Sequence, residues 1–184
     1  MNATPLVSQT SEVSGFPRWS ETLHDRSRVL IRPINKLDHD AERAFIEGLS
    51  PESRHFRFLG AVGHPSERML DQFTDIDPAR EAAFVAVVPV DSHERIVGVS
   101  RLVADDDGLN CECAVTVSDD WQNKGLGTVL MKHLIEVARA RGLRTMISID
   151  SFENMEMKEL ARHLGFQTRV DPDDARQVIH ELAL

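Results

Sequence analysis

Tyrosine is missing from this sequence, and cysteine is too scarce for a disulfide framework or a structural zinc site. The two cysteines, Cys111 and Cys113, stand two residues apart. In an extended strand such residues point the same way without disulfide geometry, and Cys-x-Cys alone supplies too few ligands for zinc. We therefore expect buried thiols, no metal site and a reducing, cytoplasmic location.

Basic residues are also scarce, because 21 Lys and Arg face 30 Asp and Glu, for a net charge of −9. Affinity for a phosphate backbone comes mainly from clustered Lys and Arg, so we do not expect nucleic-acid binding. No apolar run approaches a membrane span, and the first 20 residues lack the basic and apolar regions of a secretory signal. An acidic surface favours cationic partners such as amines or Lys-bearing proteins, although most such surfaces are only solvated.

Length and composition indicate one domain. The chain has 184 residues, with 41% hydrophobic and 28% charged, which is typical of a globular domain with a sizeable core. Residues 1–20, rich in Ser and Thr, are expected to form a flexible N-terminal tail, whose end Phe16 and Trp19 are able to pin onto the domain. The folded domain is then expected over residues 21–184.

Hydrophobic periodicity predicts an α/β (α+β) fold with a mixed, mostly antiparallel sheet flanked by helices. Asp38 is the expected N-cap of the first helix, and Gly142 and Gly165 are expected to end two others. Asp105 to Gly108 is expected to be a solvated hairpin turn rather than a calcium loop. The predicted strands span 29–34, 82–90, 95–103, 111–117, 145–149, 166–170 and 177–182, and the predicted helices span 39–49, 52–59, 66–73, 126–141 and 154–164.

A glycine loop joins a predicted strand to the strongest predicted helix. It reads Gln122-Asn123-Lys124-Gly125-Leu126-Gly127-Thr128. Glycines let backbone amides approach an anion, and the helix N-terminus adds a favourable dipole. A dinucleotide-binding turn needs three glycines in a parallel βαβ unit, and a Walker loop needs Gly-Lys followed by Ser or Thr. Neither pattern is present, so the loop predicts a different kind of pyrophosphate site.

The loop resembles the Arg/Gln-x-x-Gly-x-Gly/Ala motif of the GNAT superfamily of N-acetyltransferases. The likeness extends over residues 29–182, because the hairpin, the strand with Glu112, the long helix, Asn154 and the Leu164-Gly165-Phe166 helix exit follow in the same order. The resemblance implies a GNAT-like fold and acetyl-CoA as co-substrate.

The resemblance also implies how the cofactor would bind. A bulge would splay the strand of Val115 from its parallel neighbour at Ile147, admitting the pantetheine arm. The arm would pair with the backbone of the strand, and the loop amides would hold the pyrophosphate. The alternative role for Asn154 is a helix N-cap. The implied cofactor-binding residues are Thr116, Val117, Gln122, Asn123, Lys124, Gly125, Leu126, Gly127, Thr128 and Asn154.

Amide formation from a thioester needs a neutral amine, so a base or a water relay must remove a proton. Glu112 stands at the position that resembles the family's glutamate base, and we expect it to be partly buried; the alternative is an ordinary strand Glu facing solvent. The family's general acid, a Tyr, would stand at Ala161. Either the thiolate departs unaided, or another donor such as Ser151 or His163 serves.

A narrower resemblance concerns the acceptor. Residues 49–58 and 75–81 are similar to the acetyltransferase domain of bacterial protein lysine acetyltransferases that silence acyl-CoA synthetases. This implies a protein lysine as acceptor and a partner such as an acyl-CoA synthetase. The alternatives are a small-molecule amine acetyltransferase, which an enclosed acidic pocket would favour, and a non-catalytic acyl-CoA-binding sensor. Arg54 and Arg57 are one helical turn apart, and their role stays open.

Overall fold

The computed structural model describes residues 17–60 and 63–184. The described strands form one sheet in the order β1-β2-β3-β4-β5-β6-β8-β7. Neighbouring strands are antiparallel except β5 and β6, which are parallel. The predicted mixed, mostly antiparallel sheet is confirmed. The strands are β1 (Trp19–Thr22), β2 (Arg28–Pro33), β3 (Glu81–Val90), β4 (His93–Ala104), β5 (Asn110–Val117), β6 (Thr145–Ser151), β7 (Gln167–Val170) and β8 (Gln177–Ala183).

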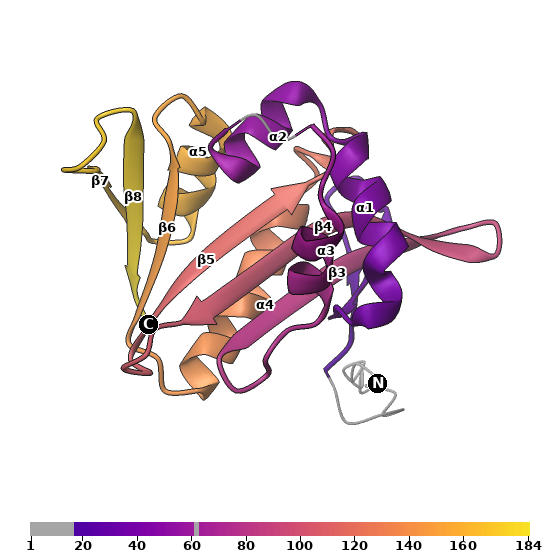
Figure 1. The fold of residues 1–184 in the computed structure, drawn as a ribbon, viewed down its shortest axis with the longest axis horizontal. Helices are drawn as coiled ribbons and strands as arrows, with labels where there is room; N and C mark the ends of the chain where they lie inside the picture. Colours follow the sequence, from indigo (N-terminus) through magenta and orange to yellow (C-terminus); the bar gives the residue numbers. More distant parts are fainter. Residues whose placement is uncertain (1–16, 61–62) are drawn as a thin grey trace, which may run out of the picture.

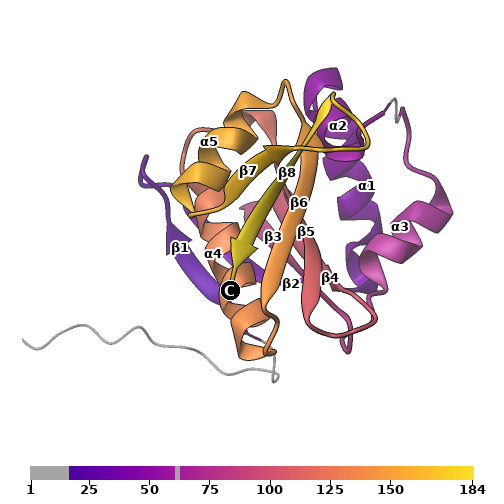
Figure 2. The ribbon, with the colours of Figure 1, turned by 90° about the vertical axis from the view of Figure 1, so that its left-hand side faces the viewer.

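Helices cover both faces of this sheet. Figure 2 shows the sheet edge-on, with α4 and α5 on one side and α1, α2 and α3 on the other. Two short 3-10 turns, η1 (Lys36–Asp38) and η2 (Asp119–Trp121), precede α1 and the glycine loop. The helices are α1 (His39–Gly48), α2 (Pro51–Phe58), α3 (Glu67–Thr74), α4 (Leu126–Ala140) and α5 (Met155–His163).

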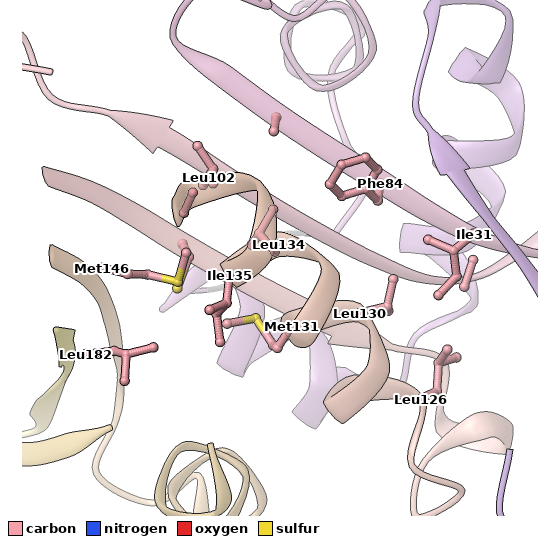
Figure 3. Packing of buried hydrophobic residues seen from close by; sticks show 14 of the residues in the cluster. Ile31, Phe84, Leu102, Leu126, Leu130, Met131, Leu134, Ile135, Met146 and Leu182 are labelled. Atoms are coloured by element: carbon pink, nitrogen blue, oxygen red, sulfur yellow. The ribbon is translucent and has the colours of Figure 1, made fainter. Parts of the chain in front are cut away.

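The apolar stripe of α4 builds the larger hydrophobic core. Leu126, Leu130 and Leu134 are buried against the sheet (Figure 3). Gly98 of β4 lies directly beneath, because a Cβ added there would come within 2.9 Å of a Leu130 methyl carbon. Close contact between helix and sheet therefore fixes the start of α4 near the end of β5.

The N-terminal boundary differs from the expected one. Trp19 and Ser20 belong to β1, where they pair with Ile31 and Leu30 of β2. The Trp19 ring stacks on His133 of α4 at 4.1 Å between centroids and meets the edge of Phe84 at 5.2 Å. This packing anchors the segment, as expected for Trp19, but Trp19 and Ser20 are part of the sheet and not of a flexible tail. Residues 1–16 lie outside the described residues.

Asp38 occupies the N-cap position of α1, as expected, but its side chain does not cap the helix. Its carboxylate instead accepts hydrogen bonds from Arg32 at 2.9 and 2.7 Å. Arg32 also pairs with Glu94 at 2.7 Å. The Asp38 hydrogen bonds, against the opposing effect of burial, hold the pKa of Arg32 above its usual range. A buried ion pair thus joins β2 to the start of α1.

None of the helices in the described part of the chain is long and apolar enough to cross a membrane.

Replacing Asp38 by Ala should destabilise the fold by about 3 kcal/mol, because it leaves the nearly buried Arg32 with only the more exposed Glu94. Asp75→Ala is the matched control, since Asp75 pairs with Lys36 in an exposed position and should cost less than about 1 kcal/mol. Urea denaturation of both variants measures the difference. Equal losses in the two variants would contradict the assignment of Asp38 as a buried structural anchor.

Candidate active site

The two parallel strands of the sheet separate after three paired positions. Asn110, Cys111 and Glu112 pair with Thr145, Met146 and Ile147. Beyond this point β5 remains paired with β4 and β6 with β8, and the two strands diverge toward α2 (Figure 1). The implied splay is therefore present. The expected bulge in β5 is not its cause, because the register of β5 with β4 is unbroken.

A cleft of about 1140 Å³ occupies the opening between the strands. One wall is the β5 segment 112–117, and the facing wall is the β6 segment 148–150. The glycine loop, α2 and residues along the length of α5 also line it. Sequence segments far apart in the chain therefore meet around one hollow.

The glycine loop presents bare backbone amides at the start of α4. Gly125 is the N-cap with a φ of 89°, a left-handed conformation that glycine adopts without strain. No side chain caps the helix, so the amides of Leu126, Gly127 and Thr128 lack the acceptor that a capping residue would supply. All three residues line the cleft. Such an end is suited to an anion.

Side chains of the loop hold it in place. Gln122 Nε2 donates to the Val117 carbonyl and to Ser53 Oγ, each at 3.3 Å. The Lys124 ammonium lies 3.2 Å from Asp25 Oδ2 and 4.6 Å from the centroid of the Trp121 ring. Lys124 is the one residue of the predicted loop that does not line the cleft. Its position indicates bracing of the loop rather than contact with a ligand.

Sequence reasoning missed His24, which lines the cleft. Its backbone N–H donates to the Lys124 carbonyl at 3.1 Å. A Cβ added at Gly125 would lie 2.8 Å from a ring carbon of His24. No local pattern indicates this contact, because it joins the turn after β1 to a loop far along the chain.

Asp119 ties α2 to the same loop region. Its carboxylate accepts from Ser50 N at 2.9 Å, from Ser50 Oγ at 2.7 Å and from Ser53 Oγ at 2.8 Å. Ser50 is the N-cap of α2, so the helix begins on a residue fixed by the segment that precedes the glycine loop. These hydrogen bonds hold the N-terminus of α2 in place, and residues of α2 line the cleft.

Glu112 lines the cleft but is exposed, so the expected partial burial is wrong. Its antiparallel neighbour on β4, Val103, is itself 42% exposed. Asn154 also lines the cleft, and its Oδ1 accepts from Met157 N at 3.1 Å. Its N-cap role is therefore present in the structure.

Arg57 reaches the cleft from α2. Its guanidinium lies 5.1 Å from the centroid of Phe58 and 5.5 Å from that of Phe73. Burial lowers the pKa of Arg57, while the carboxylates of Glu42, Asp150 and Glu112 act in the opposite direction. Arg54, in contrast, donates to the Gly63 carbonyl at 2.8 Å and does not line the cleft.

A polar network that sequence reasoning missed lies behind the β6 wall. Ser148 Oγ donates to Asp150 Oδ2 at 2.5 Å, and His180 Nε2 of β8 lies 4.0 Å from the same oxygen. His180 Nδ1 is 2.7 Å from Thr168 Oγ1. Burial raises the pKa of Asp150 and lowers that of His180. Ser148 and Asp150 are the members of this network that line the cleft.

Three positions relevant to proton donation differ in their access to the cleft. Ala161 is fully buried on α5. Ser151 lies outside the cleft wall, and its Oγ accepts from Glu153 N at 3.2 Å. His163 lines the cleft in an exposed position at the end of α5.

Comparison with known proteins identifies the architecture. A family model described as the acetyltransferase (GNAT) family matches residues 35–166. Acetyltransferase PA5475 of Pseudomonas aeruginosa is 52% identical over 183 residues, covering 97% of this chain and 98% of that protein. Acetyltransferase Pat of Mycolicibacterium smegmatis is 30% identical over 139 residues, covering 73% of this chain and 40% of that protein. The GNAT domain of S. lividans PAT has the same fold, with a TM-score of 0.83 at 23% identity, covering 91% of this chain and 97% of that one.

Gly125→Ala should weaken acetyl-CoA binding by about tenfold or more, because left-handed backbone costs a residue with a Cβ about 1–2 kcal/mol and the added atom meets the His24 ring. Gly142→Ala is the matched control, since its φ is 78° but nothing lies within 4 Å of the added Cβ. Calorimetric titration compares the two. A similar loss of affinity in both variants would contradict a specific role of Gly125, because Gly142 does not line the cleft.

Proposed function

The chain belongs to the acetyltransferase (GNAT) family, and on that premise we propose that it transfers the acetyl group of acetyl-CoA to a lysine side chain of a protein. Acyl-CoA-dependent transfer follows from the family itself. The observation that carries the assignment to this cleft is the separation of β5 from β6 beside an uncapped helix N-terminus.

The cofactor is proposed to bind by its pyrophosphate and its pantetheine arm. The amides of Leu126, Gly127 and Thr128, with the adjoining backbone of residues 122–125, would hold the pyrophosphate, since they combine bare donors with a helix dipole. The backbone of Thr116 and Val117 would pair with the arm, because the edge of β5 that faces β6 is free beyond Glu112. Asn154 would contact the arm from the start of α5.

Glu112 is the proposed base. It stands at the last paired position before the strands separate, and its carboxylate opens onto the cleft. It would take the proton of the substrate ammonium, directly or through water, so that a neutral amine attacks the thioester. A positioned base contributes about 10²–10⁴-fold to such a step.

Support for a protein lysine comes from the similarity to Acetyltransferase Pat and from the likeness of residues 49–58 and 75–81 described above. An acyl-CoA synthetase is the proposed partner. The free, buried thiols of Cys111 and Cys113 are compatible with a proposed cytoplasmic location.

A small-molecule amine is the second candidate acceptor, and the charge of the cleft suits it as well as it suits a lysine side chain. Two arginines, Arg57 and Arg162, face a larger set of carboxylates in the lining. A surplus of negative charge attracts a cationic acceptor. The carboxylates are those of Glu52, Glu112, Asp119, Asp150, Glu153, Glu156 and Glu159.

Release of free CoA thiol from acetyl-CoA distinguishes the candidates. The purified protein is given either a deacetylated acyl-CoA synthetase or a panel of small amines. Thiol release with the synthetase, together with an acetylated lysine found by mass spectrometry, supports the proposal. Release only with amines would overturn the protein acceptor, and silence despite measurable acetyl-CoA binding would favour an acyl-CoA sensor.

Glu112→Gln should lower kcat at neutral pH by about 100-fold or more, because the amide cannot accept the ammonium proton. The dissociation constant of acetyl-CoA should change by less than about twofold, since the pyrophosphate lies at the other end of the cleft. Glu136→Gln, at an exposed site on α4, is the control and should match the wild type. An unchanged kcat in the Glu112 variant would remove this residue from the mechanism.

A further inference from the structure

Thioester aminolysis leaves a thiolate that must become a thiol, yet the chain has no tyrosine to supply the proton. The position of the family's acid is Ala161, which is fully buried and carries no donor. Ser151 lies outside the cleft wall. Besides Glu112 on β5, however, the facing strand β6 contributes a second carboxyl group to the cleft, that of Asp150.

The strand register places Asp150 opposite the part of β5 that lies between Glu112 and the residues proposed to pair with the pantetheine arm, Thr116 and Val117. Glu112 pairs with Ile147 in parallel register. Three residues further along each strand, Asp150 therefore stands at the level of Val115, across the opening. Three residues of strand span about 10 Å, so Asp150 lies nearer the glycine loop than Glu112 and beside the inner end of the proposed arm site. Val115 and Asp150 both line the cleft.

Asp150 is held from behind rather than left mobile. Its backbone pairs with Val178 of β8, and Ser148 Oγ donates to its Oδ2 at 2.5 Å. The fully buried His180 stands 4.0 Å behind that oxygen and is itself held by Thr168. His180 Nε2 has no hydrogen-bond partner within the described chain. These contacts fix the carboxyl at the cleft wall.

We propose that Asp150 is the catalytic acid that protonates the sulfur of the departing CoA, a role that rests on the acetyltransferase activity proposed above. As the nitrogen–carbon bond forms and the carbon–sulfur bond breaks, the electron pair of the latter passes to sulfur. The Asp150 proton then goes to sulfur and yields the thiol. The surplus proton on the new amide nitrogen leaves to solvent, and a solvent proton restores Asp150.

The two carboxyl groups have environments that suit opposite tasks. Glu112 is exposed, whereas the Asp150 side chain is only 13% exposed. Burial raises the pKa of Asp150 in spite of the Ser148 hydrogen bond and the opposing charges of His180 and Arg57. Two carboxyl groups in such different environments commonly take different roles, one as acid and one as base. The groups that face Asp150 are Ser148 on its own strand, His180 of β8, Arg57 of α2 and Cys113 of β5.

The raised pKa gives the pH dependence a definite sign. A catalytic acid must carry its proton, so its contribution is present below its pKa and is lost as pH rises through it. Asp150→Asn should lower kcat by about 100-fold. This is the lower limit of the usual contribution of general acid catalysis, because a thiolate is a tolerable leaving group without protonation. It should also abolish the fall in kcat that accompanies ionisation of Asp150. Asp173→Asn, at an exposed loop position, is the matched control and should keep both kcat and the pH profile.

Titration of bound CoA supplies a readout that does not need turnover. Ionised Asp150 beside the sulfur disfavours the thiolate, so removing that charge should lower the pKa of the bound CoA thiol by about one unit or more. Ultraviolet absorbance of the thiolate, at saturating protein, measures this value in the wild type and in both variants. An unchanged thiol pKa in Asp150→Asn would overturn the proposal, even if kcat falls, because it would reduce Asp150 to a structural residue.

Different measurements test the proposed acetyltransferase function and the proposed role of Asp150. A wild-type protein that does not bind CoA, or that releases no thiol with any acceptor, contradicts the acetyltransferase assignment, whereas the thiol titration tests only the proximity of Asp150. If Asp150→Asn does not fold, carbon-13 NMR of Asp150 in the wild type replaces it. The carboxyl should titrate differently with CoA than with desulfo-CoA, and identical titrations would overturn the proposal.

Discussion

The candidate site depends on the parting of β5 and β6 after the pair Glu112 and Ile147. A parallel pair inside a sheet normally satisfies its backbone groups across the shared edge. Here β4 and β8 hold the outer edges of the two strands, so the inner edges open without unravelling either strand. The result is a cleft whose walls are rigid strands and whose free backbone groups are available to a ligand.

Long-range contacts position the glycine loop and α2 beside this opening. The glycine loop is fixed by Gln122 to Ser53 and by Lys124 to Asp25, and Asp119 holds the N-terminus of α2. Each contact joins segments that are distant in sequence, so the loop geometry is a property of the folded domain and not of the glycines alone. Glycine permits the backbone to follow that path, and the surrounding side chains select it.

Local patterns predicted the helices, the glycine loop and the strands other than β1, because alternation, apolar stripes and capping residues act within a few residues. The remaining features depend on partners elsewhere in the chain. The place of Trp19 in the sheet depends on its partner His133 in α4, and the environment of Asp150 depends on His180 in β8, so neither follows from a local pattern. The burial of Glu112 was misjudged since strand alternation gives a face but not what covers it.

The same reasoning explains how a chain without tyrosine can retain a complete site. Acid–base chemistry requires two groups held in different environments rather than two particular residue types. The diverging strands supply this difference by geometry: Glu112 stays at an uncovered end of the sheet, while Asp150 is backed by β8 and its buried histidine. Asp150 on β6 lines the cleft because β5 and β6 are no longer paired there, so the feature proposed to admit the cofactor also gives the cleft its second carboxyl group.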